Sequence, residues 1–281
     1  MKLLTLNAHS WLENNCEGKI KIILDAIIEN KFDIIALQEV NQRINSKIVD
    51  YKNMAMEKYV ECADDVVIKE DNFALILVDK LKKRGIDYFW SFVPNHIGYD
   101  IFDEGLAILS LKKICETNQF YISKIRDYRN YRTRRVLGIK TLDGKKDTWY
   151  FSIHMGWWND SEDPFKEQWS KIKDCLQRYF NDDIYLLGDF NSPSDINDEG
   201  YAYIKKDNIF NDTYICARVK DSGYTVKKEI DGWRESGKKS IRIDYIFKNN
   251  NKPVEFSRVI FNGKYYNEVS DHFGVYVNIS D

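Results

Sequence analysis

Groups that can bind a metal ion or move a proton stand at the ends of six short segments of this sequence. In residues 185–193 (YLLGDFNSP), three apolar residues typical of a buried strand are followed at once by Gly188, Asp189 and Asn191. Ligands of open α/β sheets bind where strands end, because loops there can aim side chains without disturbing the core. Five further segments combine an apolar run with groups of the same kind: LTLNAHSW with Asn7 and His9, IIALQEV with Gln38 and Glu39, FSIHMGWW with His154, IRIDYIF with Asp244, and SDHFGV with Ser270, Asp271 and His272.

Each of these motifs has a simpler structural explanation when it is taken alone. Asp and Asn are common turn residues, so a single GDFN sequence is more often a turn than a site. Glu39 alone would be assigned to a solvated strand end, and His154 alone to a hydrogen-bonded core histidine. Asp244 is harder to explain in this way, because it lies inside IRIDYIF, where burying a carboxylate is costly without a partner.

The combination of motifs favours a catalytic site. All four histidines lie in or beside such segments, and they are His9, His96, His154 and His272. Glu39, Asp271 and the amide oxygen of Asn7 form a set of oxygen donors, which suits Mg²⁺ or Mn²⁺ rather than zinc. Asp189 then remains as an isolated base.

Composition and charge exclude several classes of protein. The formal net charge is −2, with 42 Lys and Arg against 44 Asp and Glu, whereas proteins that grip duplex nucleic acid usually have a basic excess. Nucleic acid is therefore the less favoured partner.

The five cysteines are scattered and never spaced CxxC, which argues against a disulfide scaffold or a structural zinc site. Neither a signal-peptide pattern nor an apolar run of membrane-spanning length is found, so a cytoplasmic location without membrane contact is expected. The oligomeric state is left open.

Apolar periodicity predicts an α/β protein with many strands. Strands are expected at 2–6, 33–37, 88–93, 105–110, 135–141, 149–153, 184–187, 241–247, 254–261 and 274–279, helices at 18–30, 73–84 and 164–180, and long loops at 41–70 and 221–240. No Pro-, Gly- or Ser-rich linker divides the chain, so residues 1–281 are expected to form a single domain.

In order from Asn7 to His272, the six motifs resemble the signatures of the endonuclease/exonuclease/phosphatase superfamily. This resemblance implies a four-layered α/β sandwich, in which two mixed β-sheets pack face to face and are flanked by helices. One motif departs from the pattern. The nucleases that cut at abasic sites have N-x-D at the first motif, whereas this chain has Asn7-Ala8-His9, which argues against that branch.

The resemblance also implies a role for each matching residue. Glu39 is expected to be the principal ligand of Mg²⁺, with Asn7 close by and Asp271 completing the metal site; Mn²⁺ is a possible substitute. Asp189 is expected to orient and deprotonate the attacking water. The remaining catalytic expectations are Asn191 as a phosphate-orienting amide, His154 as a hydrogen-bond donor to phosphoryl oxygens, and His272, held by Asp244, as the second catalytic histidine.

The substrate class follows from a narrower resemblance. The segments LTLNAHSW, HIGYDIFDEGLAIL, HMGWW, DGW and VIFNGK, with the final VSDHFGV, are similar to bacterial maltose 6'-phosphate phosphatases of this superfamily. A metal-dependent phosphomonoesterase acting on a small phosphorylated sugar is therefore expected. A phosphodiesterase of the same superfamily, nuclease or sphingomyelinase-like, is the alternative.

Several residues are predicted to contact the sugar phosphate. Arg134 would bind phosphate through its bidentate fork, although a solvated charged surface is an equal interpretation of YRTRR. Indole faces suit the packing of a sugar ring, and only one of two adjacent tryptophans in a strand is expected in the core. The other predicted contacts are His9, His96, Trp157, Trp158 and Trp233, with Asp100 as a weaker candidate; Glu104 would support the metal or His154, or be a surface carboxylate.

Overall fold

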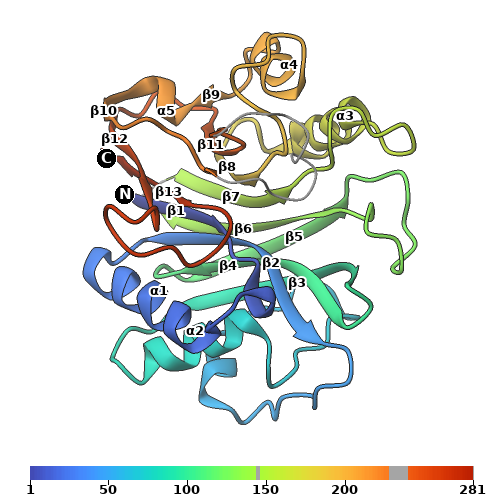
Figure 1. Cartoon of the computed structure of the whole chain (residues 1–281), viewed down its shortest axis with the longest axis vertical. Helices are drawn as coiled ribbons and strands as arrows, with labels where there is room; N and C mark the ends of the chain where they lie inside the picture. The colour runs from blue at the N-terminus through green and yellow to red at the C-terminus, as the bar shows by residue number, and fades with distance from the viewer. Residues whose placement is uncertain (144–145, 228–239, 281) are drawn as a thin grey trace.

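The strands form two mixed sheets that pack face to face (Figure 1). The structure is a computed structural model that describes residues 1–143, 146–227 and 240–280. The first sheet has the order β10-β12-β13-β1-β2-β4-β3, and its strands are β1 (Lys2–Asn7), β2 (Ile34–Arg43), β3 (Phe89–Gly98), β4 (Phe102–Ser110), β10 (Ala217–Lys220), β12 (Val254–Ile260) and β13 (Gly274–Ile279). The second has the order β5-β6-β7-β8-β11-β9, and its strands are β5 (Ile114–Tyr121), β6 (Arg135–Asp143), β7 (Lys146–His154), β8 (Asp183–Asp189), β9 (Asn211–Asp212) and β11 (Asp244–Lys248).

Helices cover the outer faces of the two sheets and complete the four layers (Figure 1). Helices α1 (Cys16–Asn30) and α2 (Phe73–Lys82) lie on the first sheet, and α3 (Phe165–Leu176) and α4 (Gly200–Lys206) lie on the second. In α3 the buried apolar residues recur at helical spacing on one face, which packs on the sheet; they are Phe165, Trp169, Ile172 and Leu176. The expected four-layered α/β sandwich is confirmed.

Strand β8, which carries the YLLGD sequence, is buried on both faces. Tyr185 and Leu187 belong to the core between the two sheets, whereas Ile184 and Leu186 pack with the residues of α3. Successive side chains of a strand point to opposite faces, so a continuous apolar run is what a strand between two buried layers requires. The run therefore holds the strand rigidly up to Asp189.

Irregularities in the strands aim side chains at one edge of the sandwich. The pairing of β2 with β4 shifts register between Leu37 and Val40, and the pairing of β3 with β4 shifts between Pro94 and His96. Such bulges re-aim side chains locally. Glu39, inside the first bulge, has a φ of 50°, and Asn191, just after β8, has a φ of 46°. Positive φ is costly for non-glycine residues and is often found at functional sites.

Several elements were not predicted from the sequence, and some predicted boundaries differ from those of the structure. Strands β5, β9 and β10, and helices α4 and α5 (Thr213–Cys216), were not expected. The expected helix 164–180 ends at Leu176 and continues as the 3-10 turn Gln177–Tyr179. The segment 41–70 is not wholly a loop, because β2 continues to Arg43 and a 3-10 helix covers Met54–Lys58. The expected strand 241–247 begins only at Asp244, and residues 228–239 of the expected loop 221–240 lie outside the described residues.

Gly188 is required by close packing against the neighbouring strand. A Cβ at this position would lie 1.8 Å from the backbone oxygen of Ile153, and φ is 156°. Changing Gly188 to Ala is expected to destabilise the protein by about 3 kcal/mol or more, because backbone atoms rather than a flexible side chain must move. Thermal unfolding would show a Tm lower by about 6 °C or more.

Gly85→Ala is the control for this prediction. Gly85 also has a positive φ, of 79°, but no atom lies within 4 Å of the added Cβ, so only about 1 kcal/mol of backbone strain is expected. Equal losses of Tm in the two variants would show that contact with Ile153 is not the cause.

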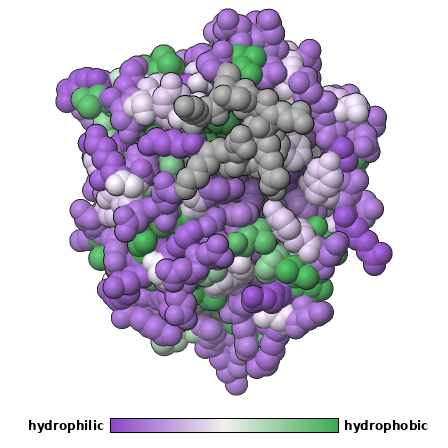
Figure 2. All heavy atoms as spheres, in the orientation of Figure 1, coloured by the Kyte–Doolittle hydropathy of each residue, from purple (hydrophilic) through white to green (hydrophobic). Residues whose placement is uncertain are grey.

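The surface in view is mainly hydrophilic, with small separated apolar patches (Figure 2). Among the described residues, no helix combines the length and apolar character needed to cross a membrane.

Candidate active site

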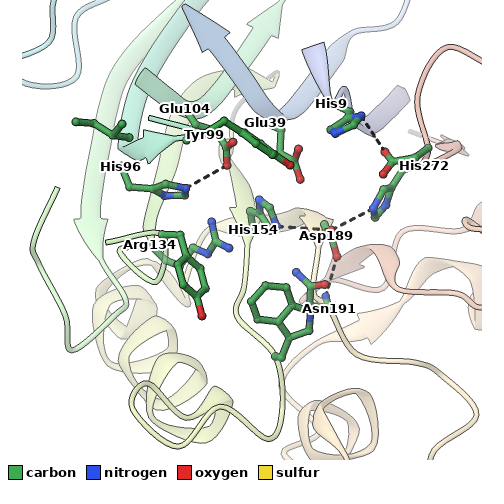
Figure 3. Close-up of a pocket in the computed structure, with 15 residues that line it drawn as sticks. His9, Glu39, His96, Tyr99, Glu104, Arg134, His154, Asp189, Asn191 and His272 are labelled. Atoms are coloured by element: carbon green, nitrogen blue, oxygen red, sulfur yellow. Dashed lines mark hydrogen bonds and ion pairs between the residues drawn. The ribbon is translucent and has the colours of Figure 1, made fainter. Parts of the chain in front are cut away.

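A cavity of about 280 Å³ opens at the edge where the bulges and strand ends meet (Figure 3). It brings together residues from both sheets that are far apart in the sequence. Its lining consists of His9, Glu39, His96, Ile97, Gly98, Tyr99, Glu104, Tyr131, Arg134, His154, Trp157, Asp189, Asn191, Asp271 and His272. Most of the residues predicted from the sequence therefore face one space.

Asp189 occupies the centre of the polar wall because of the strand register. It lies directly beside His154 across the parallel pair β7 and β8, and opposite Asp244 across the antiparallel pair β8 and β11. The backbone N–H of Asn191 donates to Asp189 Oδ1 at 2.8 Å, and Asn7 Nδ2 donates to Asp189 Oδ2 at 3.2 Å. Three adjacent strands and one following turn thus fix this carboxylate.

Two imidazoles flank the same oxygen of Asp189. His154 Nε2 and His272 Nε2 each lie 3.7 Å from Asp189 Oδ2, which is beyond a direct hydrogen bond. On its other side His272 Nδ1 lies 3.0 Å from Asp244 Oδ2. The partner of buried Asp244, which sequence reasoning required, is therefore His272.

The two histidines have opposite electrostatic environments. Burial and the cation of Arg134 hold the pKa of His154 well below its usual value, so this imidazole is neutral. Burial opposes protonation of His272 as well, but the carboxylates of Asp244 and Asp189 outweigh it and raise its pKa well above its usual value. Burial and Asp244 raise the pKa of Asp189 to about 7. Neighbouring titratable groups whose pKa values are shifted in opposite directions are typical of acid and base partners.

Changing Asp244 to Asn is expected to lower the pKa of His272, because the variant removes the closest negative charge. His272 would then be largely neutral near pH 7, and its orienting hydrogen bond would be weaker. NMR titration of the imidazole signals measures this change directly. A His272 pKa that stays well above its usual value in the variant would instead assign the shift to Asp189.

Three carboxylates crowd the opposite part of the polar wall. Burial, and the nearby charges of Glu104 and Asp271, raise the pKa of Glu39 to about 8. Mutual repulsion of this kind indicates a place for a cation, and oxygen donors suit Mg²⁺ or Mn²⁺. Glu39 and Asp271 therefore fit the expected metal site.

Asn7 is oriented differently from the expected ligand. Its Nδ2 donates to Glu39 Oε1 at 2.8 Å, while its oxygen accepts from the backbone N–H of His9 at 3.3 Å. The amide oxygen is thus turned toward the backbone, so Asn7 links Glu39 to Asp189 rather than offering oxygen to a cation in this arrangement.

His9 belongs to a second small cluster at the mouth of the cavity. Its Nδ1 lies 2.7 Å from Glu13 Oε1 and 3.8 Å from Asp271 Oδ1. Glu13 also pairs with Lys19. Sequence reasoning missed Glu13, and the only available signal was its i+4 spacing from His9.

Arg134 presents to the cavity a buried guanidinium that has no ion-pair partner in the described parts of the chain. The residue is only 4% exposed, and Nε and Nη1 are buried without a hydrogen-bond partner. The guanidinium makes no ion pair with any residue that the structure describes. A buried cation without a partner is costly unless an anion joins it, so the interpretation of YRTRR as a solvated surface is wrong for Arg134.

A model of the Endonuclease/Exonuclease/phosphatase family matches residues 12–272 of the chain. The chain belongs to this family. A family protein from Leptotrichia buccalis C-1013-b is 35% identical over 100% of both chains, with a TM-score of 0.86. The comparison with curated proteins gives no match.

More distant structures share the fold of this family member. A mannosyl-6-phosphatase from Bacteroides thetaiotaomicron VPI-5482 is 18% identical over 100% of both chains, with a TM-score of 0.62. The D. rerio TDP2 structure in complex with a single-strand DNA product is 14% identical, covering 100% of this chain and 99% of the other, with a TM-score of 0.61.

In this endonuclease/exonuclease/phosphatase family protein, the three tryptophans predicted to contact the sugar differ in their positions. Trp157 lines the cavity, and its Nε1 is buried without a partner. Trp158 packs against Phe165 and Tyr203 and is not among the residues that line this cavity. Both tryptophans follow the end of β7 at His154, so the alternation expected for adjacent strand residues does not apply to them. Trp233 lies outside the described residues.

The far wall of the cavity contains a buried pair that the sequence did not predict as a unit. His96 Nδ1 lies 3.1 Å from the carbonyl oxygen of Thr133, and its Nε2 lies 3.4 Å from Glu104 Oε1 (Figure 3). Burial opposes ionisation of Glu104, but His96 and Arg134 outweigh it and lower the pKa of this carboxyl. Tyr99 and Tyr131 at the rim were also missed, because both lie in turns without a periodic pattern.

Proposed function

We propose that this protein is a metal-dependent phosphomonoesterase that removes phosphate from a sugar phosphate such as maltose 6'-phosphate. The observation that carries the proposal is the buried guanidinium of Arg134, whose Nε and Nη1 have no hydrogen-bond partner, in the cavity that contains Asp189 and His154. A guanidinium matches the geometry of phosphate oxygens and binds them in a fork. It would place phosphorus next to the base.

Hydrolysis then needs an attacking water held in line and donors around the phosphoryl oxygens. Asp189 orients that water and accepts its proton. Neutral His154 donates to a phosphoryl oxygen, and protonated His272 stabilises negative charge as it develops. Asn191, whose Nδ2 donates to the carbonyl oxygen of Met155 at 2.8 Å, holds the turn beside the phosphate.

Glu39 and Asp271 are the residues proposed to hold the metal ion. A bound Mg²⁺ or Mn²⁺ would supply Lewis acidity and a template for the phosphate. Asn7 contributes by holding Glu39 and Asp189 at a fixed separation through one amide group.

The size and lining of the cavity support a small substrate. A volume of about 280 Å³ is near the lower limit of the roughly 300–1,000 Å³ typical of small-molecule sites. Trp157 and Tyr131, which both line the cavity, form an edge-to-face pair with centroids 6.2 Å apart, and aromatic faces suit the apolar faces of a sugar ring. The proposal keeps the cytoplasmic location expected from the sequence, where such charged metabolites are found.

The decisive assay is phosphate release from maltose 6'-phosphate by purified protein, with Mg²⁺ and after chelation. Glucose 6-phosphate, sphingomyelin and abasic DNA serve as comparison substrates. Metal-dependent release from a sugar phosphate would support the proposal. Cleavage of only DNA or sphingomyelin would move the protein to the phosphodiesterase alternative.

Changing Arg134 to Met is expected to raise KM for the sugar phosphate by about 10- to 100-fold, because a hydrogen bond to a charged group contributes roughly 1.5–3 kcal/mol. Steady-state kinetics measures this effect. Arg129→Met is the matched control, since Arg129 is exposed and lies outside the cavity. An unchanged KM in the Arg134 variant would remove the main support for the proposed phosphate site.

A further inference from the structure

A second cavity, of about 650 Å³, lies behind the catalytic cavity. Residues adjacent in sequence line the two spaces. Asp103 lines the second cavity and Glu104 the catalytic one, and Arg135, at the start of β6, and Arg134, just before it, divide in the same way. Because successive residues of a strand such as β4 point to opposite faces, the two cavities lie on opposite sides of shared backbone.

The lining of the second cavity includes two buried cations, Lys69 and Arg135, one half-buried carboxylate, Asp103, and one exposed carboxylate, Asp65. Asp103 is fully engaged, since its Oδ2 accepts from Lys69 Nζ at 2.6 Å and its Oδ1 accepts from Tyr128 Oη at 2.8 Å. Lys69 Nζ also donates to the carbonyl oxygen of Ile44 at 2.6 Å. The charges of Lys69 and Asp103 therefore balance each other.

Arg135 lacks such a direct ion pair among the described residues. Its side chain is 6% exposed, its Nε is buried without a hydrogen-bond partner, and it makes no ion pair within the described parts of the chain. The guanidinium donates to the Tyr121 hydroxyl and lies 4.3 Å from the centroid of the Tyr121 ring. These contacts orient the guanidinium but leave its Nε without a hydrogen-bond partner.

Burying a guanidinium without an anion is costly, and an anion that enters the cavity would offset this cost. We propose that the second cavity is an anion-binding site, in which a phosphate group binds against Arg135. The phosphate would be either free or part of a small phosphorylated metabolite. This inference stands apart from the proposed catalytic function, because none of its residues lines the catalytic cavity.

The remaining lining gives room for more than inorganic phosphate. Ile48 and Val67 line the cavity and are 55% and 41% exposed, so apolar surface is available beside the charged wall. A metabolite with a phosphate group and a compact organic body fits this combination better than phosphate alone. The two sources can be separated by comparing inorganic phosphate with glucose 6-phosphate.

The test uses metal-free full-length protein with assigned backbone amide signals, titrated with inorganic phosphate and separately with glucose 6-phosphate. The expected result is a saturable shift of the Tyr121 and Arg135 amides that persists in Arg134→Met, where the catalytic phosphate site is weakened. Arg135→Met is expected to weaken this binding by about tenfold or more. If Arg134→Met binds glucose 6-phosphate more tightly than inorganic phosphate, the second cavity is a metabolite site. If it binds the two equally, the cavity is a site for free phosphate.

Arg135→Lys is the second variant in case Arg135→Met does not fold. It keeps the positive charge and removes only the bidentate guanidinium group. It is expected to fold and to bind phosphate more weakly than wild type at this cavity. Shifts confined to the catalytic amides in wild type, or unchanged Tyr121 shifts in Arg135→Lys and Arg135→Met, would overturn the proposal. Neither result would affect the catalytic assay of the proposed function.

Discussion

Asp189→Asn protein is expected to lose about 1,000-fold or more in kcat, with little change in KM. General base catalysis typically contributes 10²–10⁴-fold, and Asn cannot accept the proton of the attacking water. The fold should survive, because Asn keeps the size of Asp189 and an oxygen for the backbone N–H of Asn191. Replacing a buried carboxylate whose pKa is raised to about 7 also removes a desolvation cost.

A matched control for this substitution lies at the other end of the same strand. Asp183 is buried, and its Oδ2 lies 3.2 Å from Lys252 Nζ. Asp183→Asn should lower Tm, because Lys252 and Lys146 lose a buried partner, and it should leave kcat unchanged. An Asp189→Asn enzyme with undiminished turnover would overturn the assigned mechanism. A raised KM with full kcat at saturating substrate would make Asp189 a substrate contact instead.

The sequence predicted those parts of the site that depend on strand ends. Asp189 and His154 end the apolar runs of β8 and β7, Asp244 begins β11, and the register of these three strands brings them together. The cost of burying a carboxylate required a partner for Asp244, and the resemblance to the family, not the burial cost, implied that this partner is His272. Such features are local or follow from a general penalty, so they can be predicted without coordinates.

Other features depend on tertiary geometry that leaves no periodic signal. Strand β5 lies at the edge of its sheet, and most of its side chains are partly or fully exposed, so its sequence does not alternate. The aim of Glu39 depends on a bulge with φ of 50°. The orientation of the Asn7 amide depends on two acceptors more than 30 residues away in sequence. Local propensity predicts neither contact.

The lack of an ion pair for Arg134 and Arg135 among the described residues is likewise a property of the folded protein. In sequence, YRTRR is an ordinary basic run. In the structure Arg132 pairs with Asp160 at 2.7 Å, whereas the next two arginines are buried without a carboxylate partner. Only the full set of contacts separates a structural arginine from two that have charge available for a ligand.

Glu39→Gln is expected to abolish metal-dependent turnover and to stabilise the metal-free protein. Gln keeps the size of the side chain but removes one of three neighbouring carboxylates. Burial, Glu104 and Asp271 raise the pKa of Glu39 to about 8 from its ordinary 4.5. A carboxyl whose pKa is raised by folding destabilises the protein as pH rises from the unfolded to the folded value. The free energy of unfolding gained by the Glu39→Gln substitution should therefore be small near pH 5 and reach on the order of 3 kcal/mol or more at pH 9.

Thermal unfolding in the presence of a chelator, at pH 5 and pH 9, measures this gain as a Tm difference that widens with pH. Wild type should recover stability at pH 9 when Mg²⁺ is added, because metal binding offsets the same repulsion, whereas Glu39→Gln should not respond. Glu57→Gln is the control, because that carboxylate is 64% exposed and pairs only with Lys82 among the described residues. A Glu39 variant that is less stable than wild type at pH 9, or that keeps its response to Mg²⁺, would remove Glu39 from the metal site.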